Sequence, residues 1–141
     1  MFLRIYVCET NTPGYYYVGT TLRLPHHRER EHRLGHGSRF TSKHGFRRFV
    51  FMELIEPGTG VNLEDDLTLA LMARFGWGAV RGGNFVALHE HTLRRWLPAA
   101  FRDLGPRDVL PLHLRPVSKF PAELRRLLNR FEVVRGLEHT D

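Results

Sequence analysis

The stretch that decides the fold is Leu3-Arg4-Ile5-Tyr6-Val7-Cys8, followed after a short gap by Tyr15-Tyr16-Tyr17-Val18-Gly19. Both runs are rich in β-branched and aromatic residues, which favour strands. Asn11-Thr12-Pro13-Gly14 lies between them, and a Pro-Gly pair in this place is typical of a turn. The sequence therefore predicts a β-hairpin over residues 2–8 and 15–20 that carries Tyr6 and Tyr17.

A segment dense in Arg and His follows the hairpin. Thr20 or Thr21 is a candidate N-cap for a helix, and Gly35 is a typical stop signal. Leu24 is the only large apolar residue over 23–33, so this helix has little apolar stripe to bury. We expect it to be a solvated helix or to present a cationic face to a ligand.

The rest of the first half supplies one more strand and one more helix. Residues 35–46 are expected to form a loop with many phosphate-binding donors, and residues 47–55 a third strand. Asn62 is a candidate N-cap for a helix that ends near Gly76, with Asp65 at the capping-box position. The predicted fold is α/β, or α+β in stricter terms, with a small, mostly antiparallel three-stranded sheet flanked by helices.

The last third of the chain is different, because prolines divide it into short pieces. Its final helix is predicted to begin at Pro121 and to bury the residues that recur at helical spacing, which are Leu124, Leu127, Leu128 and Phe131. The sequence thus predicts a domain over 1–85 and a helical extension over 86–141. The extension either packs on the domain or mediates assembly, as in a homodimer.

Composition narrows the class of protein. The 141 residues are 42% hydrophobic, enough for a core, and the net charge of +6 favours polyanionic partners, chiefly nucleic acid. Cys8 is the only cysteine, so no internal disulfide forms. We expect its thiol to be buried in the fold and the protein to reside in a reducing compartment. No apolar stretch approaches the ~20 residues of a membrane span. The protein is expected to be cytoplasmic, with no membrane partner.

The order of the motifs resembles that of the GIY-YIG nuclease family. Tyr6 matches the tyrosine of the first family motif, although Arg4 stands where that motif has glycine. Tyr17-Val18-Gly19 matches the second motif. Arg28 matches the family's helix arginine, and His32 matches the histidine one helical turn later. The resemblance covers residues 3–54 best and implies a fold of GIY-YIG type.

Two of the matches have competitors. The distance from the second motif to Arg28 is slightly longer than in close relatives, so Arg23 remains an alternative. The resemblance also implies a metal-binding glutamate on the helix after the third strand, where Glu64 is the best match. The other acidic candidates for this role are Asp65, Asp66 and Glu53.

The resemblance implies a metal-dependent DNA endonuclease that leaves 5′-phosphate and 3′-hydroxyl ends. Phosphodiester hydrolysis needs an activated water and charge relief at the phosphate. Glu64 would hold Mg²⁺ or Mn²⁺, Arg28 would stabilise the developing charge, and His32 would assist proton movement. Either Tyr6 or Tyr17 would orient or deprotonate the attacking water, and the motifs leave this choice open.

Basic residues outside the motifs are candidates for contacts with the nucleic-acid backbone. They are Arg23, Arg33, Arg39, Lys43, Arg47, Arg48 and Arg81. DNA is the expected partner, with RNA left open, and residues 86–141 contain no helix-turn-helix or zinc-finger pattern that would read sequence. The segment 81–84 is either a glycine nest for phosphate or a simple turn. The main alternative function is a noncatalytic nucleic-acid-binding module that retains the fold.

Overall fold

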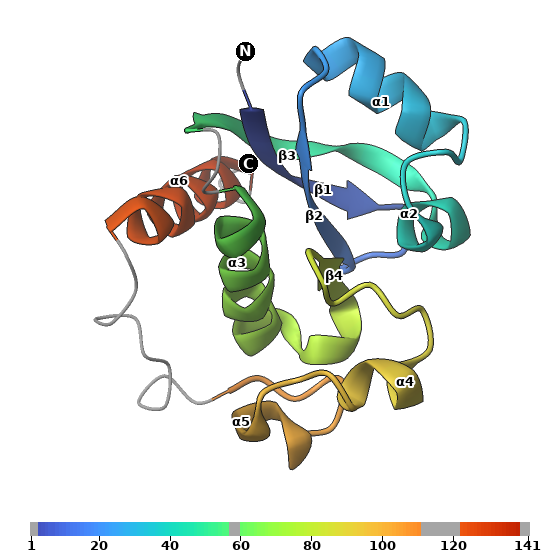
Figure 1. The fold of residues 1–141 in the computed structure, drawn as a ribbon, viewed down its shortest axis with the longest axis vertical. Coiled ribbons are helices and arrows are strands. Elements are labelled where there is room, and N and C mark those ends of the chain that lie inside the picture. The colour runs from blue at the N-terminus through green and yellow to red at the C-terminus, as the bar shows by residue number, and fades with distance from the viewer. Residues whose placement is uncertain (1–2, 57–59, 111–121, 139–141) are drawn as a thin grey trace.

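A computed structural model describes residues 3–56, 60–110 and 122–138 (Figure 1). The strands are β1 (Leu3–Thr10), β2 (Tyr16–Thr21), β3 (Phe46–Ile55) and β4 (Val80–Gly82). The helices are α1 (Pro25–Arg33), α2 (Arg39–His44), α3 (Gly60–Phe75), the 3₁₀ turn η1 (Trp77–Ala79), α4 (Glu90–Arg94), α5 (Ala99–Arg102) and α6 (Ala122–Glu138). The mixed α/β class, with helices around a sheet, is confirmed.

The sheet has four strands in the order β3-β1-β2-β4, one more than predicted. Strand β1 is antiparallel to both β2 and β3, as expected for a hairpin and its neighbour. Strand β4 adds to β2 in the parallel direction and pairs only with Tyr16–Val18. This strand is too short to have a periodic pattern of its own, so the prediction of three strands was wrong.

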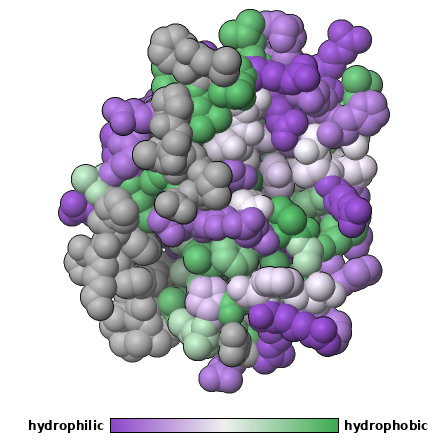
Figure 2. All heavy atoms as spheres, viewed as in Figure 1, coloured by the Kyte–Doolittle hydropathy of each residue, from purple (hydrophilic) through white to green (hydrophobic). Residues whose placement is uncertain are grey.

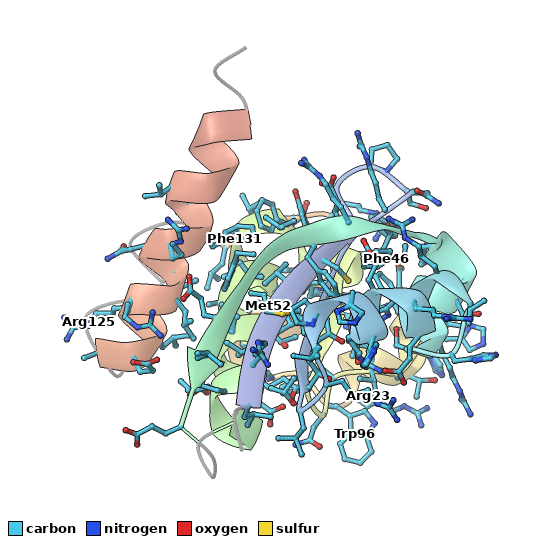
Figure 3. The ribbon with its side chains drawn as sticks, turned by 90° about the horizontal axis from the view of Figure 1, so that it is seen from above. Arg23, Phe46, Met52, Trp96, Arg125 and Phe131 are labelled. Atoms are coloured by element: carbon cyan, nitrogen blue, oxygen red, sulfur yellow. The ribbon has the colours of Figure 1, made fainter. Side chains whose placement is uncertain are left out.

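The two faces of the sheet carry different chemistry. Successive side chains of a strand point to opposite faces, so Ile5 and Val7 enter the main apolar core while Tyr6 and Cys8 enter a smaller, aromatic cluster. Helices α3 and α6 cover the first face and α1 and α2 the second (Figure 1). Phe131 points from α6 toward the sheet (Figure 3). The paired tyrosines therefore belong to the face of α1.

The main core draws on the C-terminal third of the chain as well as on the first 85 residues. The predicted apolar positions of α6 are all buried in it, beside Leu67 and Leu71 of α3; they are Leu124, Leu127, Leu128 and Phe131. Leu93 and Leu97, on and just after α4, join the same core. The C-terminal third and the first 85 residues therefore share one apolar core. The predicted helix start, Pro121, lies outside the described residues.

Helix α1 begins later than predicted. Thr20 and Thr21 are the last residues of β2, so neither caps the helix. The N-cap is Leu24, without a side-chain hydrogen bond, and Pro25 occupies the first turn, where its missing N–H costs nothing. The predicted end is close to the observed one, because Gly35 follows the helix with a φ of +81°. The start of α1 is therefore set by Pro25 and not by capping at Thr20 or Thr21.

Two further helix boundaries differ from the prediction. The expected loop over 35–46 contains α2, whose N-cap Ser38 accepts a hydrogen bond from Thr41 N. Helix α3 begins at Gly60, before Asn62. Asn62 therefore lies inside the helix, and the predicted N-cap and capping box at Asn62 and Asp65 were wrong.

Cys8 is buried, as predicted. Within the described ranges, none of the helices has the length and apolar character that crossing a bilayer requires.

Candidate active site

Tyr6 lies at the centre of the candidate site, on the face of β1 that α1 covers. Its side chain is fully buried, with 0% exposure. Its hydroxyl accepts a hydrogen bond from Arg28 Nε at 3.0 Å and lies 2.8 Å from His32 Nε2. An arginine N–H can only donate, whereas the hydroxyl can donate to His32 or accept from it, according to the tautomer of the imidazole. Hydrogen bonds therefore link Arg28, Tyr6 and His32 in series.

His32 continues this chain away from Tyr6. Its Nδ1 lies 3.0 Å from Thr41 Oγ1, which in turn lies 2.7 Å from Ser38 Oγ. In the tautomer in which Nε2 accepts from Tyr6, the Nδ1–H group donates a hydrogen bond to Thr41. Burial first, and then the charge of Arg28, lower the pKa of His32 to about 4. The imidazole is therefore neutral near pH 7, with a hydrogen-bond partner at each ring nitrogen.

Two glycines make room for this chain of side chains. Gly19 is the register partner of Tyr6, and a Cβ on Gly19 would lie 2.4 Å from the Tyr6 hydroxyl oxygen. A Cβ on Gly37 would lie 2.1 Å from His32 Nδ1. Real Cβ atoms do not approach other atoms so closely. The glycine of the Tyr-Val-Gly motif is thus explained by the close approach of the Tyr6 ring.

Arg28 is the arginine of α1 that reaches Tyr6. Besides the Tyr6 hydroxyl, it contacts the carbonyl of Gly37 at 3.3 Å and Glu31 at 3.6 Å, and its side chain is 16% exposed. Its competitor Arg23 is 65% exposed and pairs with Glu31 at 3.3 Å. The structure therefore places Arg28, and not Arg23, against the tyrosine, and leaves a small part of the Arg28 side chain open to solvent.

Tyr17 lies beside the Tyr6–His32 pair and is 8% exposed, against 0% for Tyr6. Its ring centroid is 6.4 Å from that of Tyr6 and 5.8 Å from that of His32. Burial and then the nearby Glu64 carboxylate raise the pKa of Tyr17 to about 12, against hydrogen bonding by Ser38. Tyr17 also lines a groove of about 480 Å³. Of the two tyrosines, it is the one that meets an open surface.

Glu64 reaches the site around the edge of the sheet. Strand β4 stops short of the end of β2, and there Thr20 Oγ1 donates to Glu64 Oε2 at 2.9 Å. The backbone N–H of Gly83 donates to Oε1 at 3.1 Å. Burial raises the pKa of Glu64, although both hydrogen bonds and the charge of Arg28 oppose the rise. Glu64 thus shares an electrostatic environment with Arg28 and Tyr17.

The other acidic candidates have different surroundings. Asp65 accepts hydrogen bonds from the backbone N–H of Asn84 at 2.7 Å and from its side chain at 2.9 Å, so it holds the turn after β4. Glu53 pairs with two arginines of α6, on the far face of the sheet. In the described part of the chain, no three His, Cys, Asp or Glu side chains cluster closely enough to hold a metal ion. Among the acidic candidates, Glu64 is the one whose pKa, raised by burial, is lowered in part by the charge of Arg28 and by a hydrogen bond from the hairpin residue Thr20.

The predicted backbone-binding residues divide into two groups. Four are exposed but engaged in surface ion pairs with glutamates, namely Arg23, Arg33, Arg47 and Arg48. Arg39 and Lys43 on α2 are exposed, and among the residues that the structure describes neither is paired with a carboxylate. Figure 2 shows hydrophilic side chains gathered over α1 and α2, at the upper right of the face it presents.

The prediction for Arg81 was wrong. Its side chain is 1% exposed, and its guanidinium donates to five backbone carbonyls, those of Trp77, Gly78, Val80, Ala87 and Leu88. It also lies over the ring of Phe40, with its Cζ 5.1 Å from the centroid. A phosphate cannot reach this group. Arg81 instead ties β4 to the chain that follows it.

The segment 81–84 is a turn and not an open nest for phosphate. The Gly83 and Asn84 backbone N–H groups already donate to Glu64 and Asp65. A Cβ on Gly83 would lie 1.9 Å from an oxygen of Asp65, and Gly83 has a φ of +53°. The glycine therefore allows the turn to approach the acidic start of α3.

Sequence reasoning missed the polar side chains that support the site. Thr41 and Ser38 orient His32, and Thr20 orients Glu64. The Ser38-x-x-Thr41 spacing at an N-cap was the one available signal.

No family model, no curated protein and no solved structure matches this chain.

Proposed function

We propose that this protein is a metal-dependent DNA endonuclease of GIY-YIG type, which hydrolyses phosphodiester bonds. The observation that carries the proposal is the hydrogen-bonded series Arg28–Tyr6–His32, with Tyr17 and Glu64 beside it. These are the five residues that the motif resemblance assigns to catalysis. They come from β1, β2, α1 and α3, so their meeting depends on the fold and not on proximity in the sequence.

Arg28 supplies fixed positive charge in this proposal. Its contacts with Tyr6, Gly37 and Glu31 hold the guanidinium in one place, while 16% of the side chain stays exposed. A charge fixed in advance stabilises a developing oxyanion without having to reorganise. Arg28 is therefore the group that would meet a nonbridging phosphate oxygen.

The two tyrosines take different roles. The Tyr6 hydroxyl is buried and already bonded to Arg28 and His32, so Tyr6 positions the arginine. Tyr17 lines the groove and is the tyrosine that a water or phosphate can reach. With a pKa of about 12, its phenol is protonated near neutral pH and orients the attacking water by hydrogen bonding.

In this proposal His32 does not contact the substrate and acts through Tyr6. Its side chain is 1% exposed, and both ring nitrogens have partners in Tyr6 and Thr41. As a neutral acceptor it fixes the direction in which the Tyr6 hydroxyl points. We therefore assign His32 as a positioning residue.

Glu64 fits a hard divalent cation. A carboxylate has about four lone-pair positions, and Thr20 and Gly83 occupy two of them, leaving the others for a ligand. Mg²⁺ is commonly held by one or two carboxylates, with water and substrate phosphate completing its shell. When bound, Mg²⁺ or Mn²⁺ would supply charge relief at the phosphate and an activated water. Glu64 is the residue that would hold it.

Nucleic-acid binding is supported by the charge of the chain and by its basic α2 helix. The net charge is +6, and Arg39 and Lys43 lie along grooves next to Tyr17. Arg23, Arg33, Arg47 and Arg48 extend the exposed basic surface over α1 and the start of β3. DNA is the proposed partner.

A noncatalytic nucleic-acid-binding module is the second candidate. It is favoured by one observation, that no three His, Cys, Asp or Glu side chains of the described residues cluster closely enough to hold a metal ion. Such a protein would keep the basic grooves and the fold but bind no metal.

Plasmid nicking with the Glu64→Gln variant separates the two candidates. We expect the wild-type protein to nick supercoiled DNA with Mg²⁺ or Mn²⁺ and to spare it with EDTA. Glu64→Gln should abolish nicking while DNA binding persists or tightens slightly, because a negative charge near the phosphates is removed. Glu53→Gln, on the far face of the sheet, is the matched control and should nick normally.

Salt dependence provides the second measurement. Binding through several arginines and lysines should weaken steeply with salt, with a slope of about one counterion per phosphate contact. A wild-type protein that binds with this slope but never nicks DNA, over a range of pH and metal concentrations, would falsify the enzymatic proposal. The binding module would then be the function.

A further inference from the structure

Trp96 is the most exposed large apolar side chain of the described chain, at 69%. Its backbone is nevertheless fixed. The neighbouring Leu93 and Leu97 are buried in the main core, and the Trp96 N–H donates to the Leu93 carbonyl at 2.9 Å. The indole therefore projects from a rigid segment, away from the sheet (Figure 3). An aromatic ring held in this way offers a face on which a nucleic-acid base can stack.

The Trp96 indole lines the groove of about 480 Å³ that also contains Tyr17. Polar and charged groups on other walls of this groove come from Ser38, Arg39 and Asn84. The volume lies within the roughly 300–1,000 Å³ typical of sites that enclose a small organic group. One groove therefore joins an aromatic face, a guanidinium and a proposed catalytic residue.

A second groove, of about 530 Å³, adjoins the first one. The two share Ser38, Arg39 and Leu88, and the second adds Lys43 and His36. Among the described residues, Arg39 and Lys43 have no carboxylate partner, so their charge is available to an anion. The positive charge thus continues away from Tyr17 along a path that a phosphate backbone could follow.

We propose that these joined grooves hold an unpaired nucleotide of the substrate, with its base stacked on Trp96 and its phosphate near Arg39. In a duplex both faces of each base are covered by neighbouring bases, so only an unpaired base can stack on an indole. The preferred substrate is therefore nucleic acid with a single-stranded segment adjoining the bond to be cut. This inference rests on the proposed function, because Tyr17 is shared by the groove and the catalytic site.

Tryptophan fluorescence tests the contact directly. Trp77 is 2% exposed and donates its indole N–H to the Leu104 carbonyl, so a quencher in solution reaches Trp96. We expect a dT12 oligonucleotide to quench the emission and a blunt duplex of equal length to quench it much less. Equal quenching by both, or none by dT12, would overturn the proposal.

Binding affinities of variants give the second test. Stacking of a base on an aromatic side chain contributes about 1–3 kcal/mol, so Trp96→Ala should weaken dT12 binding by about 5- to 150-fold. Trp96→Phe should recover most of this loss, and duplex affinity should change far less. Val133→Ala is the matched control, since Val133 is 54% exposed on α6, on the far face of the sheet. Equal losses for Trp96→Ala and Val133→Ala would refute base stacking.

Two outcomes separate this inference from the proposed function. Duplex nicking by the wild type, together with unchanged dT12 binding in Trp96→Ala, would overturn the groove proposal and leave the nuclease standing. Loss of dT12 binding in Trp96→Ala, in a protein that never nicks, would support the groove and remove the nuclease. If Trp96→Ala instead converts a dimer to a monomer in sedimentation and leaves dT12 binding intact, the indole is a protein contact and the proposal fails.

Discussion

The buried His32 makes the stability of the fold depend on pH in a defined window. Its pKa is about 4 in the folded protein, against an ordinary value of 6.5. A histidine whose pKa is depressed by folding contributes its full stability above pH 6.5 and loses it as pH falls toward 4. Each pKa unit corresponds to about 1.4 kcal/mol, so the whole effect is about 3 kcal/mol. About 2 kcal/mol of it should be lost by pH 5.

Urea denaturation of the wild type and of His32→Gln, followed at several pH values between 7.5 and 4.5, measures this effect. Glutamine keeps a polar group at the position but does not titrate. The gap in unfolding free energy between the two proteins should therefore narrow by about 2 kcal/mol from pH 7.5 to pH 5. His27→Gln, at an exposed position of α1, controls for the loss of a histidine from this helix. Parallel curves for wild type and His32→Gln would refute the neutral, buried imidazole, as would an NMR titration of its Cε1 proton near 6.5.

Three substitutions test the other parts of the site. Gly19→Ala should destabilise the fold by about 1–3 kcal/mol, measured by thermal unfolding, because its Cβ would collide with the Tyr6 hydroxyl; an unchanged Tm would contradict the close approach. Arg28→Ala should reduce cleavage by roughly 100-fold and reduce DNA affinity much less, and equal losses would make Arg28 a docking residue. Arg23→Ala is its control, and a larger loss of cleavage there would move the catalytic role to Arg23. Arg81→Ala should cost at least about 3 kcal/mol of stability, because several buried carbonyls lose their donor, while a neutral result would mean that water replaces the guanidinium.

Much of the fold follows from local patterns in the sequence. The hairpin, the third strand and the apolar stripe of α6 were predicted correctly, because each is long enough to show its period. Strand β4 could not be predicted in this way. It has three residues and exists because they add to β2, about sixty positions earlier in the chain. Short elements that depend on distant partners carry no signal of their own.

The candidate site was predictable in its central residues and not in its supports. Tyr6 and Arg28 could be chosen from motif order. Only the fold shows that residue 19 must be glycine, because a Cβ there would collide with the Tyr6 side chain. Arg81 was misjudged for a physical reason. A charged residue in a sequence is expected to lie on the protein surface. A guanidinium can nevertheless be buried when enough carbonyls accept its hydrogen bonds. The acceptors of Arg81 come from both sides of its own turn, and no composition rule anticipates them.

The burial of Cys8 makes its thiol a probe of how often the aromatic cluster on the sheet opens to solvent. The thiol lies in the central part of β1, between β2 and β3, with 0% exposure, and it is the only cysteine of the chain. Its side chain lies in the aromatic cluster under α1 and α2, so a thiol reagent can react only when this cluster opens, and the labelling rate measures how often it does. Because Tyr6 is two residues away on the same face, a ligand that binds at the candidate site should slow this reaction without touching the sulfur.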